Sequence, residues 1–581
     1  MNKREMELFG YLTYKCHILI HNYDLDSGWG DVVIKKNGNG YIFYIVERTT
    51  KNNYKELKDF NELVTLVAEK LVTDKEDKDY LYSLLEPEKT YTRNLTMMTD
   101  FYELTMGQAY LKHHKENEIA VFDVFFRKNP FDKGYGIMGG LHEVIKFLKK
   151  AHFNDEDIEY LRSKNIFDEA FLNYLRNFKF HGDVYAIPDG TPVFANEPIL
   201  TVKAPLIEAQ VIETILLSYL NAGIMYITAA KRVTEAAGDI SIMEFGARRA
   251  LGPETATMAS VYAIIGGCAS TSNVLAGEEA GVEISGTDAH SYITSFPTEL
   301  DAFIAYADTY PDNCVLLVDT YDVLRSGVPN AIITARYLRK KGYELKGIRI
   351  DSGDLAYLTK EAKKMLVEAG FPDVKICVSN SINERTINSL KEQGAVIDAI
   401  GLGDNIVLPD KARVGCVYKE VALKDGDEYT AKIKASNDEQ KAITPGYKKV
   451  YRFYDKDTGY ALGDVIALYE ENIPKKEFTL VDPNNETNFT RITNYNVRPL
   501  QETIFENGEL VYEEPTILEK KEYCKEQMKT LYPEIKREEN PHTYYVDLTR
   551  KLLLLKKELL KQAKAQVVDY REEKSSAWTL K

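Results

Sequence analysis

The chain has 581 residues, 44% of them hydrophobic, with 74 Lys and Arg against 89 Asp and Glu, which gives a formal net charge of −15. Because a domain holds roughly 100–200 residues, this length corresponds to two to four domains or to one large α/β unit with additions. A chain of this size can bury a core that needs neither disulfides nor structural metals. The acidic balance argues against general nucleic-acid binding, which depends on clustered Lys and Arg, but it leaves small anionic substrates open.

The cysteines and the short apolar segments indicate where in the cell the protein is located. The six cysteines are scattered and form no Cys-x-x-Cys pair, which argues against a zinc site and suits a reducing compartment. No segment reaches the roughly 20 apolar residues of a membrane span, and the N-terminus lacks the apolar stretch of a signal peptide. We therefore expect a soluble, cytoplasmic protein that binds neither membranes nor nucleic acid.

Residues 1–92 are predicted to form an accessory α+β segment. Tyr41–Val46 is aromatic and β-branched and follows Asn-Gly-Asn-Gly, which predicts a strand or a hairpin. Apolar residues from Phe60 to Leu71 recur at the spacing of an amphipathic helix. The charged stretch Asp74–Asp79 is typical of a loop or a solvated surface. Nothing in this segment points to chemistry, and its role stays open.

Residues 93–230 are predicted to contain helices and the first part of a β-rich domain, because Gly182–Val202 combines Pro and Gly with alternating apolar residues. Residues 421–581 are expected to complete that domain and to add helices, among them an amphipathic helix over Leu552–Leu560. Three further runs have the composition of strands: Lys448–Tyr454, Ala461–Leu468 and Thr479–Asp482.

Residues 231–420 alternate between short β-rich runs and helix-like segments. The runs are Ile240–Phe245, Val282–Ile284, Cys314–Val318, Gly347–Ile350, Val374–Val378 and Val396–Ile400. Their ends follow one another at the spacing of one strand plus one crossover helix, which predicts consecutive βα units with parallel strands. Sites in such folds lie at the carboxyl ends of the strands, and each of these runs ends in polar residues or glycine. A functional site is therefore expected at this edge.

Among the nine histidines, His290 is the strongest candidate for a catalytic residue, because it follows a predicted strand end within Ser-Gly-Thr-Asp-Ala-His-Ser. A histidine there can be a general base, a metal ligand or a nucleophile that accepts a phosphoryl group. Asp288 could help to orient its ring. The alternative is a loop histidine that is bonded to neighbouring backbone, but the other polar strand ends favour a function.

Arg248, Arg249 and Arg349 also lie at predicted strand ends. Arginine offers a planar fork that matches carboxylate or phosphate and stays charged. The alternative is pairing with neighbouring acids, which suits one of the tandem pair. Arg349 is harder to explain as structural, because an inward arginine needs an anionic partner.

Five carboxylates belong to the same predicted edge: Asp319, Asp322, Asp351, Asp354 and Asp404. Such a group can hold hydrated Mg²⁺ or the hydroxyls of a ribose, while one or two of its members are expected to cap helices. There is no Walker A sequence and no Gly-x-Gly-x-x-Gly. The residues indicate an enzyme that acts on phosphorylated, anionic small molecules with Mg²⁺, without identifying the reaction.

The chain resembles the nicotinate phosphoribosyltransferase family along most of its length, from about residue 93 to 565. The matching segments are T-D-F-Y-E-L-T-M-G-Q-A-Y (99–110), F-F-R-K-N-P-F (125–131), E-F-G-A-R-R-A (244–250), G-T-D-A-H-S (286–291), L-L-V-D-T-Y-D (316–322), I-R-I-D-S-G-D-L (348–355), G-L-G-D-N (401–405), T-P-G-Y-K-K-V-Y-R (444–452) and N-P-H-T-Y-Y-V (540–546).

This resemblance implies an irregular, incomplete α/β barrel of parallel strands over residues 231–420, with a second β-rich domain built from both flanks. It implies an enzyme of NAD biosynthesis that joins nicotinate to 5-phosphoribosyl-1-diphosphate and releases nicotinate mononucleotide and diphosphate. ATP hydrolysis would be coupled through a phosphorylated histidine, and His290 matches that position. It also implies Mg²⁺ and a homodimer with shared active sites.

The resemblance also assigns substrate contacts. Tyr102 matches the aromatic residue that stacks on the pyridine ring, Thr287 and Arg349 match ligands of nicotinate, and Arg248 matches an arginine that faces substrate. The remaining predicted contacts are Ser352, Gly353, Gly403 and Asp404, with Asp319 and Asp351 as candidate Mg²⁺ ligands. Asp404 and Asn405 stand where a hydroxyl residue is expected beside the ribose phosphate.

Three alternatives stay open at this point. Nicotinamide phosphoribosyltransferase has the same fold, and Arg349 alone does not exclude it. A non-catalytic metabolite-binding relative would not need His290 and the carboxylates. A barrel aldolase would need a lysine at a strand end, and the strand ends above contain none.

Overall fold

The computed structural model describes residues 94–565 with gaps at 412, 435–442, 484–486 and 488. Before residue 94 it describes position 8 and the stretches 31–37, 40–47, 50–57, 60–70 and 75–83. The chain forms two compact units, Met1–Arg93 and Asn94–Lys581. None of the helices in the described part is long and apolar enough to span a membrane.

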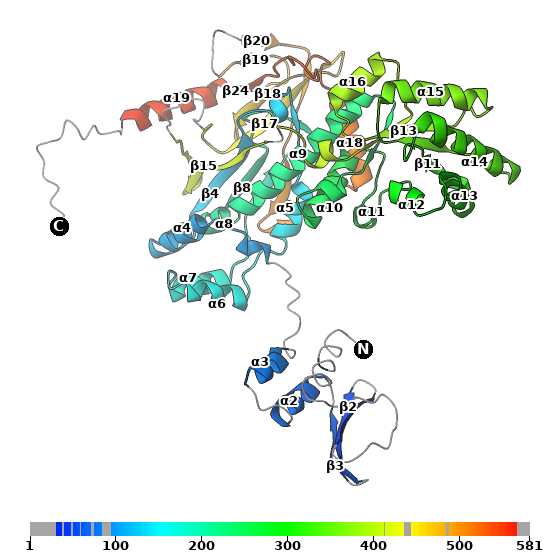
Figure 1. The fold of residues 1–581 in the computed structure, drawn as a ribbon. Coiled ribbons are helices and arrows are strands. Elements are labelled where there is room, and N and C mark those ends of the chain that lie inside the picture. The colour runs from blue at the N-terminus through cyan, green and yellow to red at the C-terminus, as the bar shows by residue number, and fades with distance from the viewer. Residues whose placement is uncertain are drawn as a thin grey trace, which may run out of the picture. The chain divides into compact units, whose positions relative to one another are not determined.

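The N-terminal unit contains an antiparallel sheet in the order β1-β2-β3, followed by two helices (Figure 1). Its elements are β1 (Asp31–Asn37), β2 (Gly40–Glu47), β3 (Thr50–Leu57), α2 (Phe60–Lys70) and α3 (Lys75–Ser83). The strand predicted at Tyr41–Val46 and the helix that begins at Phe60 are confirmed. Of the two alternatives for Asp74–Asp79, the loop is wrong, because the residues from Lys75 onward belong to α3. A solvated helix surface fits instead, since Lys75 is exposed.

The second unit contains a six-stranded parallel sheet in the order β10-β9-β14-β13-β12-β11. Its strands are β9 (Ser241–Glu244), β10 (Ser270–Thr271), β11 (Val315–Leu317), β12 (Gly347–Ile350), β13 (Lys375–Ser379) and β14 (Ala399–Leu402). Five of the six predicted strands are confirmed to within a few residues. The strand predicted at Val282–Ile284 is wrong: only Ile284 forms a bridge, with Thr271, and β10 takes that place in the sheet.

Helices follow most of these strands, as parallel crossovers require. They are α10 (Pro253–Ile265), α11 (Val274–Ala280), α12 (His290–Thr294), α13 (Glu299–Thr309), α14 (Val328–Lys340), α15 (Leu355–Glu368), α16 (Glu384–Glu392) and α17 (Asp404–Val407). Hydrogen bonds between the described strands give a sheet with two edges, β10 and β11, and do not by themselves close it into the predicted barrel.

A β-rich part is built from both flanks of the parallel sheet, as predicted. Its seven-stranded sheet has the order β16-β15-β4-β8-β6-β22-β23, and a four-stranded sheet has the order β21-β17-β18-β24. The strands are β4 (Ile119–Phe126), β6 (Asp183–Ala186), β8 (Leu200–Pro205), β15 (Cys416–Asp425), β16 (Glu428–Ala431), β17 (Lys448–Asp455), β18 (Ala461–Leu468), β21 (Tyr495–Pro499), β22 (Glu502–Glu506), β23 (Glu509–Leu510) and β24 (Val546–Leu548).

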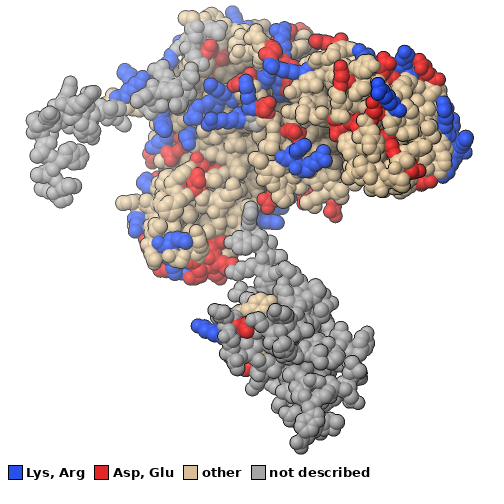
Figure 2. Space-filling model, in the orientation of Figure 1, with Lys and Arg blue, Asp and Glu red and all other residues tan. Residues whose placement is uncertain are grey.

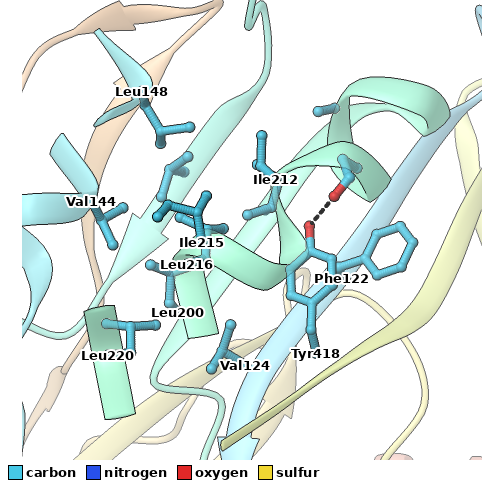
Figure 3. Packing of buried hydrophobic residues seen from close by; sticks show 14 of the residues in the cluster. Phe122, Val124, Val144, Leu148, Leu200, Ile212, Ile215, Leu216, Leu220 and Tyr418 are labelled. Carbon is cyan, nitrogen blue, oxygen red and sulfur yellow. Dashed lines mark hydrogen bonds between the residues drawn. The ribbon is translucent and has the colours of Figure 1, made fainter. Parts of the chain in front are cut away.

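Helices cover this part and connect it to the parallel sheet. Those used below are α4 (Phe101–Lys112), α5 (Leu141–Leu148), α8 (Leu206–Val211), α9 (Glu213–Ala237) and α19 (Arg550–Ala565). The apolar face of the β4–β8 sheet packs against α5, α8 and α9, as Figure 3 shows for Phe122, Leu200 and Leu216. Helix α9 continues to the parallel sheet (Figure 1), where Arg232 donates two hydrogen bonds to Glu384 of α16.

The segment T-P-G-Y-K-K-V-Y-R has a structural role. Lys448 of β17 is buried and donates to Asp123 of β4 at 2.5 Å, while Arg452 forms a two-point ion pair with Asp464 of β18. The Tyr544 hydroxyl also donates to Asp464, at 2.8 Å. Because a buried charge is stable only with its partner, these pairs fix β17 against its neighbours.

Candidate active site

The carboxyl ends of three neighbouring strands are joined by hydrogen bonds. Asp319, which follows β11, accepts at Oδ2 from the Asp351 backbone N–H at 3.0 Å and from the Ser352 hydroxyl at 2.6 Å. Asp351 in turn accepts from the hydroxyl of Ser379, at the end of β13. The second oxygen of Asp319, Oδ1, is buried without a hydrogen-bond partner. These strand ends form a rigid rim that contains two carboxylates, Asp319 and Asp351.

His290 faces these two carboxylates. It is the first residue of α12, and its Nε2 lies 3.9 Å from Asp319 Oδ1 and 3.9 Å from Asp351 Oδ2. Its Nδ1 lies 3.2 Å from the Thr320 hydroxyl. The side chain is 47% exposed, so solvent and ligands reach the ring. The structure thus brings together three of the predicted site residues.

Asp288 does not orient the His290 ring by a hydrogen bond, so that expectation is wrong. Its carboxylate accepts instead from the Leu317 N–H of β11 at 3.2 Å. Its backbone carbonyl accepts from Arg349 Nη2 at 3.1 Å and from the Thr287 hydroxyl at 3.2 Å. Burial raises the pKa of Asp288 to about 6, and the nearby Arg349 limits that rise. Thr287 and Arg349 therefore lie close together, because both donate to the same carbonyl.

The tandem arginines differ in their contacts. Arg249 forms an exposed ion pair with Asp404 at 3.2 Å, whereas Arg248 is exposed and, among the described residues, has no ion-pair partner. Gly246 lies close to the β14 end, because a Cβ on it would meet the Gly403 carbonyl oxygen at 2.8 Å. Arg249 thus fits the alternative of pairing with an acidic residue, and Arg248 is the member of the pair without such a partner in the described part of the chain.

The aspartates and glycines after β11 and β12 serve partly as turn and cap residues. Asp322 and Asp354 accept from the first backbone N–H groups of the helical segments that follow them, so the capping alternative is confirmed for these two. Gly353 has a φ of +83°, a left-handed conformation that favours glycine. It lets the chain turn from Ser352 into α15.

Tyr102 lies on α4, next to Glu103, and is 45% exposed. Its charged neighbours are Asp100, Glu103 and Glu213, none of which belongs to the rim. Glu103 is fully buried and accepts hydrogen bonds from the Thr99 and Thr214 hydroxyls, which hold the first turn of α4 against α9. Within one chain, the structure does not bring Tyr102 into contact with His290.

Comparison with known proteins identifies the family. The N-terminal domain model of nicotinate phosphoribosyltransferase matches residues 97–221, and the C-terminal domain model matches residues 447–556. The nicotinate phosphoribosyltransferase of Bacillus subtilis is 40% identical over 482 residues, which cover 83% of this chain and 98% of that protein. The chain belongs to the nicotinate phosphoribosyltransferase family.

Other relatives agree with this assignment. The nicotinate phosphoribosyltransferase of Caenorhabditis elegans is 36% identical over 521 residues, with 78% of this chain and 92% of that protein covered. The crystal structure of human nicotinic acid phosphoribosyltransferase superposes with a TM-score of 0.70 at 30% identity, covering 80% of this chain and 99% of that one. The mixed α/β fold with a parallel sheet and a β-rich part is therefore a nicotinate phosphoribosyltransferase fold.

Sequence reasoning did not single out some residues of this rim. Thr320 and Thr271 take part in hydrogen bonds there, and the Phe245 ring packs against Gly401, where a Cβ would lie 2.5 Å from it. All three stand at or next to strand ends, so position could have signalled them. Their side chains are too common in loops and cores for composition to do so.

Two properties bear on anionic ligands and metals in this member of the family. Lys and Arg are interspersed with Asp and Glu on the face shown in Figure 2. In the described part of the chain, no group of three or more His, Cys, Asp or Glu is arranged to hold a metal ion. Mg²⁺ usually needs only one or two carboxylates beside water and substrate phosphates, so the unpartnered Oδ1 of Asp319 and the exposed side of Asp351 fit it.

The buried carboxyl group of Glu103 should make the stability of the protein depend on pH. Burial raises the pKa of Glu103 to about 7, although the Thr214 and Thr99 hydroxyls favour its charged form. The folded state therefore holds the proton more tightly than the unfolded state, whose glutamate pKa is about 4.3. As the pH rises from about 4.5 to 7, the free energy of unfolding of the wild type should fall by about 3 kcal/mol relative to Glu103→Gln. Unfolding of both proteins at pH 5, 6, 7 and 8 measures this, and parallel profiles would contradict it.

Proposed function

We propose that the chain is a nicotinate phosphoribosyltransferase, which transfers the phosphoribosyl group of 5-phosphoribosyl-1-diphosphate to nicotinate with ATP hydrolysis coupled through His290. The products are nicotinate mononucleotide and diphosphate, which places the enzyme in NAD biosynthesis in the cytoplasm. The observation that supports this most is family membership over nearly the whole length of the Bacillus subtilis relative, together with the grouping of Thr287, Arg349 and His290 on one rim.

The rim suggests how the substrates are held. Arg349 and Thr287 would bind the carboxylate of nicotinate, because a guanidinium and a hydroxyl are donors that match it. Arg248 would contact the diphosphate, and Ser352, Gly353 and Gly403 would surround the ribose phosphate. In the reaction, the pyridine nitrogen forms a bond to C1 while the bond from C1 to the diphosphate oxygen breaks and its electrons leave with diphosphate. Alignment of these partners and stabilisation of the leaving anion would supply the catalysis.

The surroundings of His290 suggest how it accepts a phosphoryl group. Asp319 and Asp351 both face Nε2, so they favour a proton on that nitrogen and leave the lone pair of Nδ1 available. Nδ1 would attack the γ-phosphorus of ATP, and the bond to the ADP oxygen would break. Asp319 and Asp351 would also be the ligands of Mg²⁺, which when bound supplies charge neutralisation at the phosphates.

We infer further that the parallel sheet closes as an irregular barrel through residues 284–288. The Ser285 N–H donates to the Thr271 carbonyl at the β10 edge, at 2.9 Å. Three residues later, Asp288 accepts from the Leu317 N–H at the β11 edge. Because β10 and β11 are the two edge strands, one short segment reaches from one edge to the other and continues into His290.

A homodimer would complete the site. Phe101 and Tyr102 expose large apolar surfaces on α4, and Leu251, Val274 and Tyr321 expose apolar surface on the loops and the helix start beside the rim. Apolar side chains that gather in one exposed patch are typical of interfaces, and in the proposed dimer these residues would form such patches. In such a dimer, Tyr102 of one subunit would stack on the nicotinate that is bound by its partner.

The test is an assay of nicotinate and nicotinamide with 5-phosphoribosyl-1-diphosphate, with and without ATP. We expect slow use of nicotinate without ATP and much faster use with it, with formation of ADP. Preference for nicotinamide would favour the alternative transferase, and binding without turnover of either base would favour a non-catalytic relative.

A further inference from the structure

Glu244 is a buried carboxylate that the proposed reaction does not use. It is the last residue of β9 and is fully buried, and no Lys, Arg or His in the described part of the chain forms an ion pair with it. Its Oε1 accepts from the Gly246 N–H and its Oε2 from the Thr271 hydroxyl at 2.6 Å. Burying a carboxylate costs free energy, which its hydrogen bonds must offset. The two bonds therefore point to a role for Glu244.

The two partners of Glu244 belong to different parts of the rim. Gly246 precedes the turn Ala247–Arg249, which contains Arg248. Thr271 ends β10, and its backbone carbonyl accepts from Ser285, at the start of the segment that leads to His290. The backbone carbonyl of Glu244 also accepts from the Ser272 N–H at 2.9 Å. Glu244 thus anchors both the loop of Arg248 and the strand that supports the His290 segment.

Close contacts also restrict the backbone of Gly246, in addition to its hydrogen bond to Glu244. A Cβ there would meet Val407 Cγ1 at 2.6 Å and the Gly403 carbonyl at 2.8 Å, so the loop is pressed against the β14 end on one side. Glu244 Oε1 would lie 2.9 Å from the same Cβ, so the carboxylate and the β14 end enclose Gly246 together. The contact between Glu244 and Gly246 therefore restricts the start of the turn that carries Arg248.

We propose that Glu244 is a positioning residue for the phosphoribosyl donor: it holds the Gly246–Arg249 turn so that Arg248 faces the diphosphate. This rests on the proposed function, in which Arg248 contacts that anion. Glu244 itself touches no substrate. Its effect is to keep a flexible, exposed arginine close to one orientation, which matters because orientation of catalytic contacts is a large part of rate and affinity.

The test uses Glu244→Gln and Thr271→Val in the full chain. A glutamine has one acceptor oxygen, so it keeps at most one of the two bonds in its present direction, while valine keeps the shape of threonine without its hydroxyl. We expect either change to raise the KM for 5-phosphoribosyl-1-diphosphate about 10-fold and to leave the KM for nicotinate within about 2-fold. Thr271→Val removes the hydroxyl that holds the other oxygen of the same carboxylate, so the carboxylate loses its fixed direction toward Gly246. Because both changes act through this one carboxylate, their effects should not add in the double variant. Thr271→Ser keeps the hydroxyl and should have the wild-type KM.

The outcomes separate this proposal from the proposed function. An unchanged KM for 5-phosphoribosyl-1-diphosphate in both variants would overturn the positioning role, whether or not kcat or the melting temperature falls. If Glu244→Gln does not fold, Thr271→Val decides by the same criterion. Arg248→Ala serves as reference: a raised KM there with unchanged values in the other two overturns only the positioning role. An unchanged KM in Arg248→Ala overturns the assignment of Arg248 and the present inference with it.

Discussion

We expect His290→Ala to transfer the phosphoribosyl group at the same slow rate with and without ATP. The wild type should be accelerated by ATP, because the phosphorylated ring would add negative charge and acceptor oxygens beside Asp319 and Asp351 and change how the rim holds anions. Alanine has no nucleophile, so ATP cannot modify the site. The transfer step itself needs no attack by histidine, and a basal rate should therefore survive.

The measurement is ADP and nicotinate mononucleotide formed per unit time, with and without ATP, together with the melting temperature. His113→Ala is the matched control, since His113 is exposed at the end of α4 and belongs to no part of the rim. Acceleration by ATP that persists in His290→Ala would refute the phosphohistidine. Loss of folding without a change in coupling per folded molecule would show that His290 is a structural loop residue.

The parallel sheet could be predicted because buried parallel strands are continuous apolar runs with polar ends. Cys314–Val318 shows this, since it contains β11 and is followed by Asp319. Strand β10 could not be predicted, because its two residues, Ser270 and Thr271, are polar and too short for a pattern. The nearby segment Val-Glu-Ile at 282–284, with two β-branched residues, therefore took its place in the prediction, although its only bridge is formed by Ile284.

Pairs of strands that are far apart in the sequence also could not be predicted from local sequence patterns. Strand β6 pairs with β22 from the far end of the chain, and β4 pairs with β15, so the sheet order depends on tertiary packing. The same holds for the site. The grouping of His290 with Asp319 and Asp351 followed from a shared edge of parallel strands. The pairing of Arg249 with Asp404, which leaves Arg248 unpaired, depends on how two loops pack and became visible only in three dimensions.

We expect Arg349→Ala to raise the KM for nicotinate about 10- to 100-fold with a much smaller change in kcat. A charge-assisted hydrogen bond between a guanidinium and a carboxylate is worth about 1.5–3 kcal/mol, and the contact is made in the ground state as well as in the transition state. Nicotinamide has no carboxylate, so its KM should change little. Steady-state kinetics with both bases at saturating 5-phosphoribosyl-1-diphosphate measures the difference.

The local structure makes a second variant necessary. Arg349 lies on β12, donates to the Asp288 carbonyl, and has a buried Nε, so alanine removes a structural contact as well as a ligand. Arg349→Lys keeps the charge but not the planar fork, and should show an intermediate KM for nicotinate if two-point binding of the carboxylate matters. Arg491→Ala, which removes only an exposed pair with Glu477, is the control and should match the wild type. A KM for nicotinate that is unchanged in both Arg349 variants would remove Arg349 from the carboxylate site, and equal effects on both bases would mean that it contacts the phosphoribosyl donor instead.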